Sequence, residues 1–133
     1  MGLELTLLFT YRNRDLERVK IAMDSLDAQN DSNFTVLFID YGSSLAHSKA
    51  LQDLLSNYSF VTYFYSYHID QPWSRAKAVN IGIQLVTTPY VFVSDIDMIF
   101  KPNFIEIVQQ LKDPMVSVYF KVGFLNQIES KKN

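Results

Sequence analysis

The stretch 90-YVFVSDIDMIF-100 joins a run of strand-forming residues to two aspartates, Asp95 and Asp97, with one residue between them. The run 90–94 is short and rich in β-branched and aromatic residues, which predicts a buried strand. If the chain turns after that strand, both carboxylates can reach one divalent cation. Hard oxygen ligands of this kind suit Mg²⁺ or Mn²⁺. The alternative is a solvated turn in which an aspartate caps the next helix.

On both sides of this stretch, short apolar runs alternate with segments whose apolar residues recur at helical spacing. The runs predict strands over residues 3–10, 34–39, 60–67, 90–94 and 115–120. The periodic segments predict helices over residues 14–28, 46–55, 75–86 and 102–112. For the third helix, Ser74 is the expected N-cap. Its apolar face is expected to hold Ala76, Val79, Ile83 and Val86.

This alternation predicts an α/β fold in which a doubly wound, mainly parallel sheet carries helices on both faces. The chain has 133 residues and shows no linker, repeat or low-complexity segment, so we expect a single domain over residues 1–133. Ligands of doubly wound folds bind beyond the carboxyl ends of the strands. The polar segments of interest all lie at strand ends or at the helix starts beside them.

The overall composition excludes several classes of protein. Apolar residues make up 48% of the chain and charged residues 20%, so it can bury a core. A net charge of −2 gives no electrostatic reason to expect a nucleic acid partner or an anionic membrane surface. Because the chain has no cysteine, disulfides and thiolate metal sites are excluded. We expect no membrane span and a cytoplasmic location.

The helix start in 73-WSRAKAVNIG-82 is the second candidate for binding chemistry. Arg75 falls in the first turn, where a guanidinium group and the helix N-terminus both favour phosphate. The alternative is that Arg75 and Lys77 form a solvated helix face. A glycine in mid-helix, Gly82, suggests close packing because it lowers helix stability by about 1 kcal/mol relative to alanine. Trp73 could cover a ligand, but the pattern favours a tryptophan that caps the core.

The ends of the first two strands supply the remaining candidates. Side chains and backbone of Thr10, Tyr11, Arg12 and Asn13 could hold a base or a ribose, and the carboxylate of Asp40 can accept a hydrogen bond from either. The alternative for both segments is ordinary loop chemistry. The two histidines, at 47 and 68, have no partner at metal-binding spacing and are expected at the surface or in an interface. Sequence fingerprints of dinucleotide binding, P-loops and nucleophile elbows are absent.

Taken together, four segments resemble the GT-A glycosyltransferases. They are a first strand ending in T-Y-R-N-R, a second ending in I-D-Y-G-S-S, the W-S-R-A-K-A-V-N-I-G helix start and the V-S-D-I-D strand end. The pattern is most similar to family-2 enzymes and to chondroitin-polymerase-like and β-1,4-galactosyltransferase-like members. The resemblance covers residues 4–105. It implies a GT-A fold of the nucleotide-diphospho-sugar transferase type, in truncated form.

The resemblance also implies a metal-dependent glycosyltransferase that transfers a hexosyl or N-acetylhexosaminyl group from a UDP-sugar donor with Mn²⁺ or Mg²⁺. By position, Thr10, Tyr11, Arg12 and Asp40 would hold uridine. Arg75 would lie near the diphosphate or the base. Asp95 would meet the ribose, or the metal through water, and Asp97 would coordinate the metal. The metal would offset the charge that develops on departing UDP.

The chain departs from this family pattern after Asp97. The tail 115–133 contains one acidic residue, Glu129, so no catalytic base can be assigned. We therefore expect the donor-binding half of a glycosyltransferase, and a homodimer that covers the face left open. A non-catalytic nucleotide-sugar-binding or interaction module is the alternative. The sequence does not identify the sugar, the acceptor or the linkage.

Two other α/β classes fit less well. A phosphotransfer receiver domain needs an acidic pair after its first strand, where this chain has Arg12-Asn13-Arg14. A haloacid-dehalogenase-like phosphohydrolase has its D-x-D at the first strand, whereas here the motif follows the fourth predicted strand.

Overall fold

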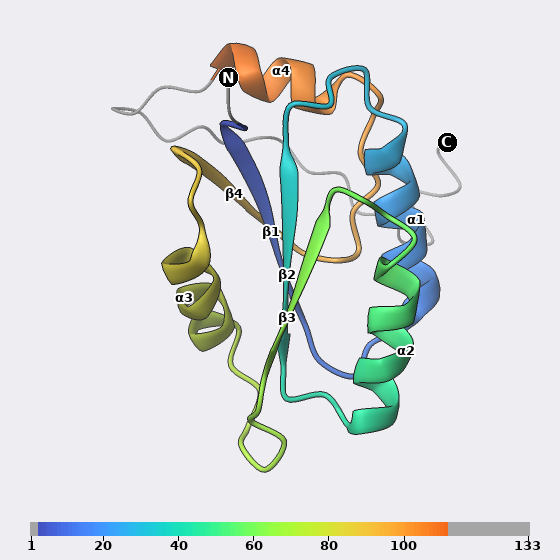
Figure 1. The fold of residues 1–133 in the computed structure, drawn as a ribbon, viewed down its shortest axis with the longest axis vertical. Coiled ribbons are helices and arrows are strands. Elements are labelled where there is room, and N and C mark those ends of the chain that lie inside the picture. Colours follow the sequence, from blue (N-terminus) through green and yellow to red (C-terminus); the bar gives the residue numbers. More distant parts are fainter. Residues whose placement is uncertain (1–2, 112–133) are drawn as a thin grey trace, which may run out of the picture.

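The computed structural model describes residues 3–111 as a parallel sheet with helices on both faces (Figure 1). The strands are β1 Leu5–Tyr11, β2 Thr35–Tyr41, β3 Val61–Ser66 and β4 Tyr90–Ser94. The helices are α1 Leu16–Asp27, α2 Leu45–Leu55, α3 Arg75–Leu85 and α4 Phe104–Leu111. The expected alternation and the doubly wound α/β fold are confirmed up to α4. The fifth predicted strand, 115–120, lies outside the described residues.

The strand order is β3-β2-β1-β4, and all three pairings are parallel. The two central strands are buried along almost their whole length, because helices cover them on both faces. The chain moves outward from β1 to β2 and β3, and then returns through α3 to place β4 on the other side of β1. The strand order therefore reverses between β1 and β4, and this is where doubly wound folds bind their ligands.

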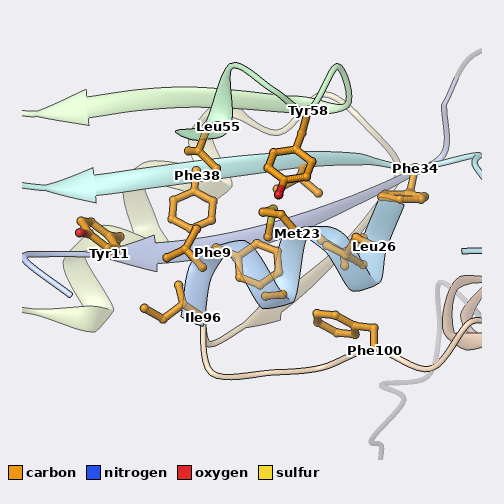
Figure 2. Packing of buried hydrophobic residues seen from close by; sticks show 14 of the residues in the cluster. Phe9, Tyr11, Met23, Leu26, Phe34, Phe38, Leu55, Tyr58, Ile96 and Phe100 are labelled. Atoms are coloured by element: carbon orange, nitrogen blue, oxygen red, sulfur yellow. The ribbon is translucent and has the colours of Figure 1, made fainter. Parts of the chain in front are cut away.

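Two clusters of apolar side chains lie on opposite faces of the sheet. The larger one joins β1 and β2 to α1, α2 and α4, and its centre is the stacked pair Phe9 and Phe38, whose ring centroids are 5.5 Å apart (Figure 2). Met23 of α1 and Phe100, which follows β4, close over this pair. The smaller cluster joins Leu8 and other residues of β1 and β2 to Ala78 of α3.

Helix α3 packs on the sheet through a different face from the one expected. Its buried residues are Ala78 and Gly82, while Ile83 is 43% exposed and Ala76 is also exposed. A Cβ at position 82 would lie 2.3 Å from Cδ1 of Leu8, so the glycine lets the helix backbone approach β1 closely. The expectation of close packing at Gly82 is confirmed. The predicted helix face is wrong for Ala76 and Ile83, because that close approach fixes the rotation of the helix.

Candidate functional site

The carboxyl ends of the parallel strands meet at one edge of the sheet, and the segments 10–14, 40–44, 66–75 and 95–97 gather there. In Figure 1 the chain leaves β2 and β3 at the lower end of the sheet. Hydrogen bonds and ion pairs join these segments to one another, as described below. The structure thus brings together the segments that the sequence placed at strand ends.

The turn after β4 presents two carboxylates to solvent and buries the residue between them. Asp95 and Asp97 are exposed, whereas Ile96 is only 3% exposed and belongs to the larger apolar cluster (Figure 2). Nε of Arg75 lies 3.2 Å from Oδ1 of Asp95. Asp97 pairs with an arginine that follows β1, since Nη2 of Arg14 lies 3.1 Å from its Oδ2. The expected helix-start arginine is therefore in direct contact with Asp95, whereas Asp97 pairs with Arg14.

The end of β1 and the residues that follow it serve more as a structural connector than the sequence suggested. Thr10 and Tyr11 are buried. Arg12 donates hydrogen bonds of 2.6 Å and 3.0 Å to the carbonyls of Gln71 and Ile69, which ties the β3–α3 loop to β1. The Tyr11 hydroxyl donates to the carbonyl of Arg14 at 2.6 Å. Burial raises the pKa of Tyr11 above its ordinary value, so the hydroxyl remains a donor.

Asn13 connects the ends of β1 and β2. Its backbone has a φ of +50°, in the left-handed region that asparagine tolerates better than most residues. Its N–H donates to Oγ of Ser43 at 2.9 Å, and its side-chain Oδ1 accepts from the N–H of Ser44 at 2.9 Å. This turn places Arg12 and Arg14 on either side of a fixed asparagine.

Asp40 is fully buried at the end of β2, with an exposed fraction of 0%. One carboxylate oxygen accepts from the N–H of Ser43 at 3.0 Å, and the other accepts from the hydroxyl of Tyr63 at 2.7 Å. Burial, followed by the bond to Asp40, raises the pKa of Tyr63. The sequence suggested that Asp40 faces a ligand, but here both of its oxygens bind neighbouring strands and loops.

The loop after β2 fits tightly against the loop after β3. Gly42 has a φ of +79°, and a Cβ at this position would lie 2.5 Å from the carbonyl carbon of His68. The imidazole of His68 stacks on the ring of Tyr41, with centroids 4.3 Å apart and planes 11° apart. His47 is exposed and bonds Ser44. His68 is half-buried, so the expectation of a position at the surface or in an interface is confirmed for His47 and stays a prediction for His68.

A cavity of about 290 Å³ lies between the β1 end and the β3–α3 loop. Its lining comprises Thr10, Tyr11, Arg12, Asn13, Arg14 and Trp73. Trp73 is 46% exposed, and its ring meets that of Tyr41 in an edge-to-face contact with centroids 5.9 Å apart. The sequence favoured a tryptophan that caps the core over one that covers a ligand; the side chain contacts the buried Tyr41 and also lines the cavity, so the two roles do not exclude each other here.

The donor set at Asp95 and Asp97 fits a Mg²⁺ or Mn²⁺ ion of the kind that keeps waters and shares phosphate oxygens. Such ions bind through one or two carboxylates plus a phosphorylated ligand. Within residues 3–111 there is no group of three or more His, Cys, Asp or Glu side chains that could hold a metal. The two carboxylates would therefore be the acidic protein ligands, with the rest of the coordination shell supplied by water and phosphate.

Sequence reasoning missed two residues beside Asp97, Arg14 and Arg18. Nη1 of Arg18 lies 3.4 Å from Oδ1 of Asp97, and Arg18 comes from the first turn of α1. A cation in the first turn opposes the helix dipole, which prefers acidic residues there. This mismatch is a signal that the arginine has an anionic partner elsewhere in the fold.

Solved structures with the same arrangement define the class of the fold. A mannosyltransferase from Pyrobaculum calidifontis, PcManGT, in complex with GDP-Man and Mn²⁺, superposes with a TM-score of 0.70 at 17% identity. The match covers 87% of this chain and 34% of that one. TarS 1-349 of S. aureus superposes with a TM-score of 0.68 at 13% identity, over 80% of this chain and 31% of that one. The fold is the GT-A fold of glycosyltransferases.

The sequence places the chain within that class. Residues 6–125 match the model of glycosyl transferase family 2, and the chain belongs to this family. A curated relative, the teichoic acid poly(glycerol phosphate) polymerase of Staphylococcus epidermidis, is 27% identical over 94 residues. That match takes in 71% of this chain but 13% of the polymerase, so the chain spans a small part of its relative. Within the described residues, none of the helices has the length and apolar character needed to cross a membrane.

Proposed function

We propose that this chain binds the nucleotide-sugar donor of a glycosyltransferase, with a UDP-sugar as the first candidate and a divalent cation held at Asp95 and Asp97. The observation that carries the proposal is the geometry after β4. Two exposed carboxylates flank a buried isoleucine at the edge where the strand order reverses, and Arg75 at the start of α3 contacts one of them. Family membership supports a transferase role for the protein to which this domain belongs.

Each part of the site has a physical task in this proposal. Asp95 and Asp97 would hold the cation, which would supply Lewis-acid stabilisation of the departing diphosphate. Arg75 begins α3, whose N-terminus favours phosphate, and Ser74 caps that helix by accepting from the N–H of Lys77 at 3.2 Å. The cavity beside Trp73 is the place for the base and ribose, with Thr10, Tyr11 and Arg12 in its wall.

Asp40 takes part only indirectly in this proposal. It is fully buried, and both of its oxygens already accept hydrogen bonds from Ser43 and Tyr63. Its role is to hold the loop that contacts Asn13, and through it the cavity wall. A direct uridine contact would require Asp40 to give up one of these two partners.

Calorimetry of the 133-residue chain tests the donor site. We expect UDP to bind in the presence of Mn²⁺ and to bind at least tenfold more weakly when the metal is removed, as expected for a metal-bridged phosphate. Asp97→Ala should remove this metal dependence, and Asp53→Ala, an exposed acid on α2, is the matched control. GDP and CDP titrated in parallel report the base preference. Binding that is unaffected by either Mn²⁺ or Asp97→Ala would overturn the proposal.

Hydrolysis of a radiolabelled UDP-sugar separates transfer from simple binding. Release of free sugar by the chain alone would show that the transfer machinery is present. Metal-dependent binding without any release would favour the second candidate, a nucleotide-sugar-binding module that works within a longer protein or with a partner.

A further inference from the structure

The carboxylate of Asp97 lies between two arginines that come from a different part of the chain. Nη2 of Arg14 is 3.1 Å from Oδ2 and 3.4 Å from Oδ1, and Nη1 of Arg18 is 3.4 Å from Oδ1. Both carboxylate oxygens therefore have a cationic neighbour. All three side chains remain accessible, at 51%, 59% and 40% exposed for Arg14, Arg18 and Asp97.

The positions of Arg14 and Arg18 indicate a role beyond that of a surface ion pair. Arg18 stands in the first turn of α1, where the helix dipole disfavours a cation. Arg14 also lines the cavity, so its charge acts on both the carboxylate and whatever fills the cavity. An isolated exposed ion pair contributes only about 0.2–1 kcal/mol, so stability alone is a weak reason for this arrangement.

The balance of charge at this corner opposes a cation that arrives alone. Arg14, Arg18 and Arg75 bring three positive charges to the two negative charges of Asp95 and Asp97. A lone divalent cation would add two further positive charges within a few ångströms of the guanidinium groups. A nucleoside diphosphate offsets that excess, because its phosphates are attracted by the arginines and by the metal together.

We propose that Arg14 and Arg18 make the aspartate pair selective for a metal–diphosphate complex over the free divalent cation. This inference rests on the proposed function, because it concerns the ligand of that same site. The two arginines oppose the free cation but attract the diphosphate that accompanies it, so they lower the affinity for the cation alone relative to the affinity for the metal–diphosphate complex. By linkage, the factor by which UDP raises the affinity for Mn²⁺ equals the factor by which Mn²⁺ raises the affinity for UDP.

Binding measurements on Arg14→Gln, Arg18→Gln and the double variant test this selectivity without any activity assay. Free Mn²⁺ is followed by electron paramagnetic resonance, and UDP binding by calorimetry, at low ionic strength where screening is weak. Each variant is measured with Mn²⁺ alone, with UDP alone and with both. The control removes two exposed positive charges elsewhere, in Lys49→Gln combined with Lys101→Gln.

The expected result is a pair of opposite effects. In the double variant, affinity for Mn²⁺ alone should rise roughly two- to tenfold, and affinity for UDP alone should fall by a similar factor. The ratio of the affinity for the Mn²⁺–UDP complex to the affinity for Mn²⁺ alone should fall accordingly. A purely structural role of the arginines would instead weaken both ligands together, and the single Arg18→Gln variant on an exposed helix surface guards against loss of folding.

The measurements distinguish a failure of the selectivity proposal from a failure of the proposed function. If the unmodified chain shows metal-dependent UDP binding but the variants show no rise in affinity for Mn²⁺ alone, the selectivity proposal is wrong and the proposed function stands. If the unmodified chain shows no metal-dependent binding at all, the proposed function fails and the selectivity falls with it. An equal rise in the lysine control would show a general charge effect and would also overturn the proposal.

Discussion

Tyr63 and Asp40 show how a single buried pair supports the edge of the sheet where the candidate site lies. The hydroxyl of Tyr63 reaches across from β3 to a carboxylate at the end of β2 that has no solvent exposure. That carboxylate also holds the backbone of Ser43, whose Oγ accepts from Asn13. Hydrogen bonding at the base of the site therefore runs from β3 through β2 to β1.

We expect Tyr63→Phe to lower the free energy of unfolding by about 1–3 kcal/mol, because it leaves a buried carboxylate oxygen without its donor. Urea denaturation measures this change. Tyr67→Phe is the control, since Tyr67 is 71% exposed. If the two variants have equal stability, the bond to Asp40 contributes nothing.

Tyr58 gives a prediction for alkaline pH. Its hydroxyl donates to Oδ1 of Asp24 at 2.6 Å, and burial followed by this bond raises its pKa from 10.0 to about 12. Because the pKa in the folded state is the higher one, this contribution to stability is complete below pH 10 and is lost as the pH rises through 12. The free energy of unfolding should fall over this range, and the fall should be smaller in Tyr58→Phe. If the free energy of unfolding depends on pH in the same way in the unmodified chain and in Tyr58→Phe, the raised pKa of Tyr58 is contradicted.

At the scale of elements, the close contact between α3 and β1 depends on the absence of a side chain at Gly82. Gly82→Ala gains about 1 kcal/mol of helix propensity. It also forces a Cβ to within 2.3 Å of a side-chain atom of Leu8, which is fully buried. Overpacking of this kind costs about 1–3 kcal/mol, so we expect a net loss of up to about 2 kcal/mol in thermal or urea unfolding.

A second substitution checks the cause of that loss. Leu8→Val shortens the side chain that Gly82→Ala would meet, so the double variant should be more stable than the sum of the two single changes predicts. Gln84→Ala, at an exposed position of the same helix, should be neutral or slightly stabilising. Strict additivity of Gly82→Ala and Leu8→Val would show that the two residues do not compete for space.

The β3–α3 loop depends on Arg12. This side chain donates to two loop carbonyls, those of Ile69 and Gln71, and a lysine cannot reproduce the forked geometry. We expect Arg12→Lys to speed amide hydrogen exchange in residues 67–73 by several-fold, as measured by mass spectrometry. Arg14→Lys, which keeps the charge at the neighbouring ion pair, should leave exchange in this loop unchanged.

The order of the elements could be predicted from the sequence because β1 and β2 are almost continuously apolar and the helices carry clear caps such as Ser74. The contacts of individual side chains could not. Apolar residues occur all round α3, so only the close approach of Gly82 to Leu8 selects its buried face. The sequence did place Asp95 and Arg75 at the same edge of the sheet, but not the ion pair between them. The hydrogen bond from Tyr63 to Asp40 depends on the register between β2 and β3, which the pattern of apolar and polar residues within each strand does not encode.

At the scale of the whole molecule, the helices among residues 3–111 cover the two faces of the sheet to different extents. One face packs against α1, α2 and α4 in the larger apolar cluster, while α3 buries only Ala78 and Gly82. We expect α3 to exchange its amide hydrogens at a lower opening free energy than β1 and β2. Because Arg75 and Ser74 begin this helix, UDP with Mn²⁺ should slow its exchange more than that of α2. An equal effect of UDP with Mn²⁺ on exchange in α2 and α3 would contradict this view.

Association of two copies stays a prediction. Ile83 and Leu85 of α3 are 43% and 42% exposed, which keeps apolar surface available on the thinly covered face. Light scattering of the purified chain measures its mass in solution. A monodisperse monomer at micromolar concentration would show that the chain does not need a second copy to remain soluble.

Ile96 has a consequence for how this domain can change over evolutionary time. The residue that fixes the turn after β4 is apolar and buried, whereas the two residues proposed to handle the cation are exposed on either side of it. Replacements of Asp95 and Asp97 by uncharged residues can therefore remove the proposed cation site while the fold persists. A descendant of this chain could keep the fold after losing the proposed cation site and would then be free to acquire a scaffolding task. In such a lineage we expect Ile96 to be retained after both of its acidic neighbours have been replaced.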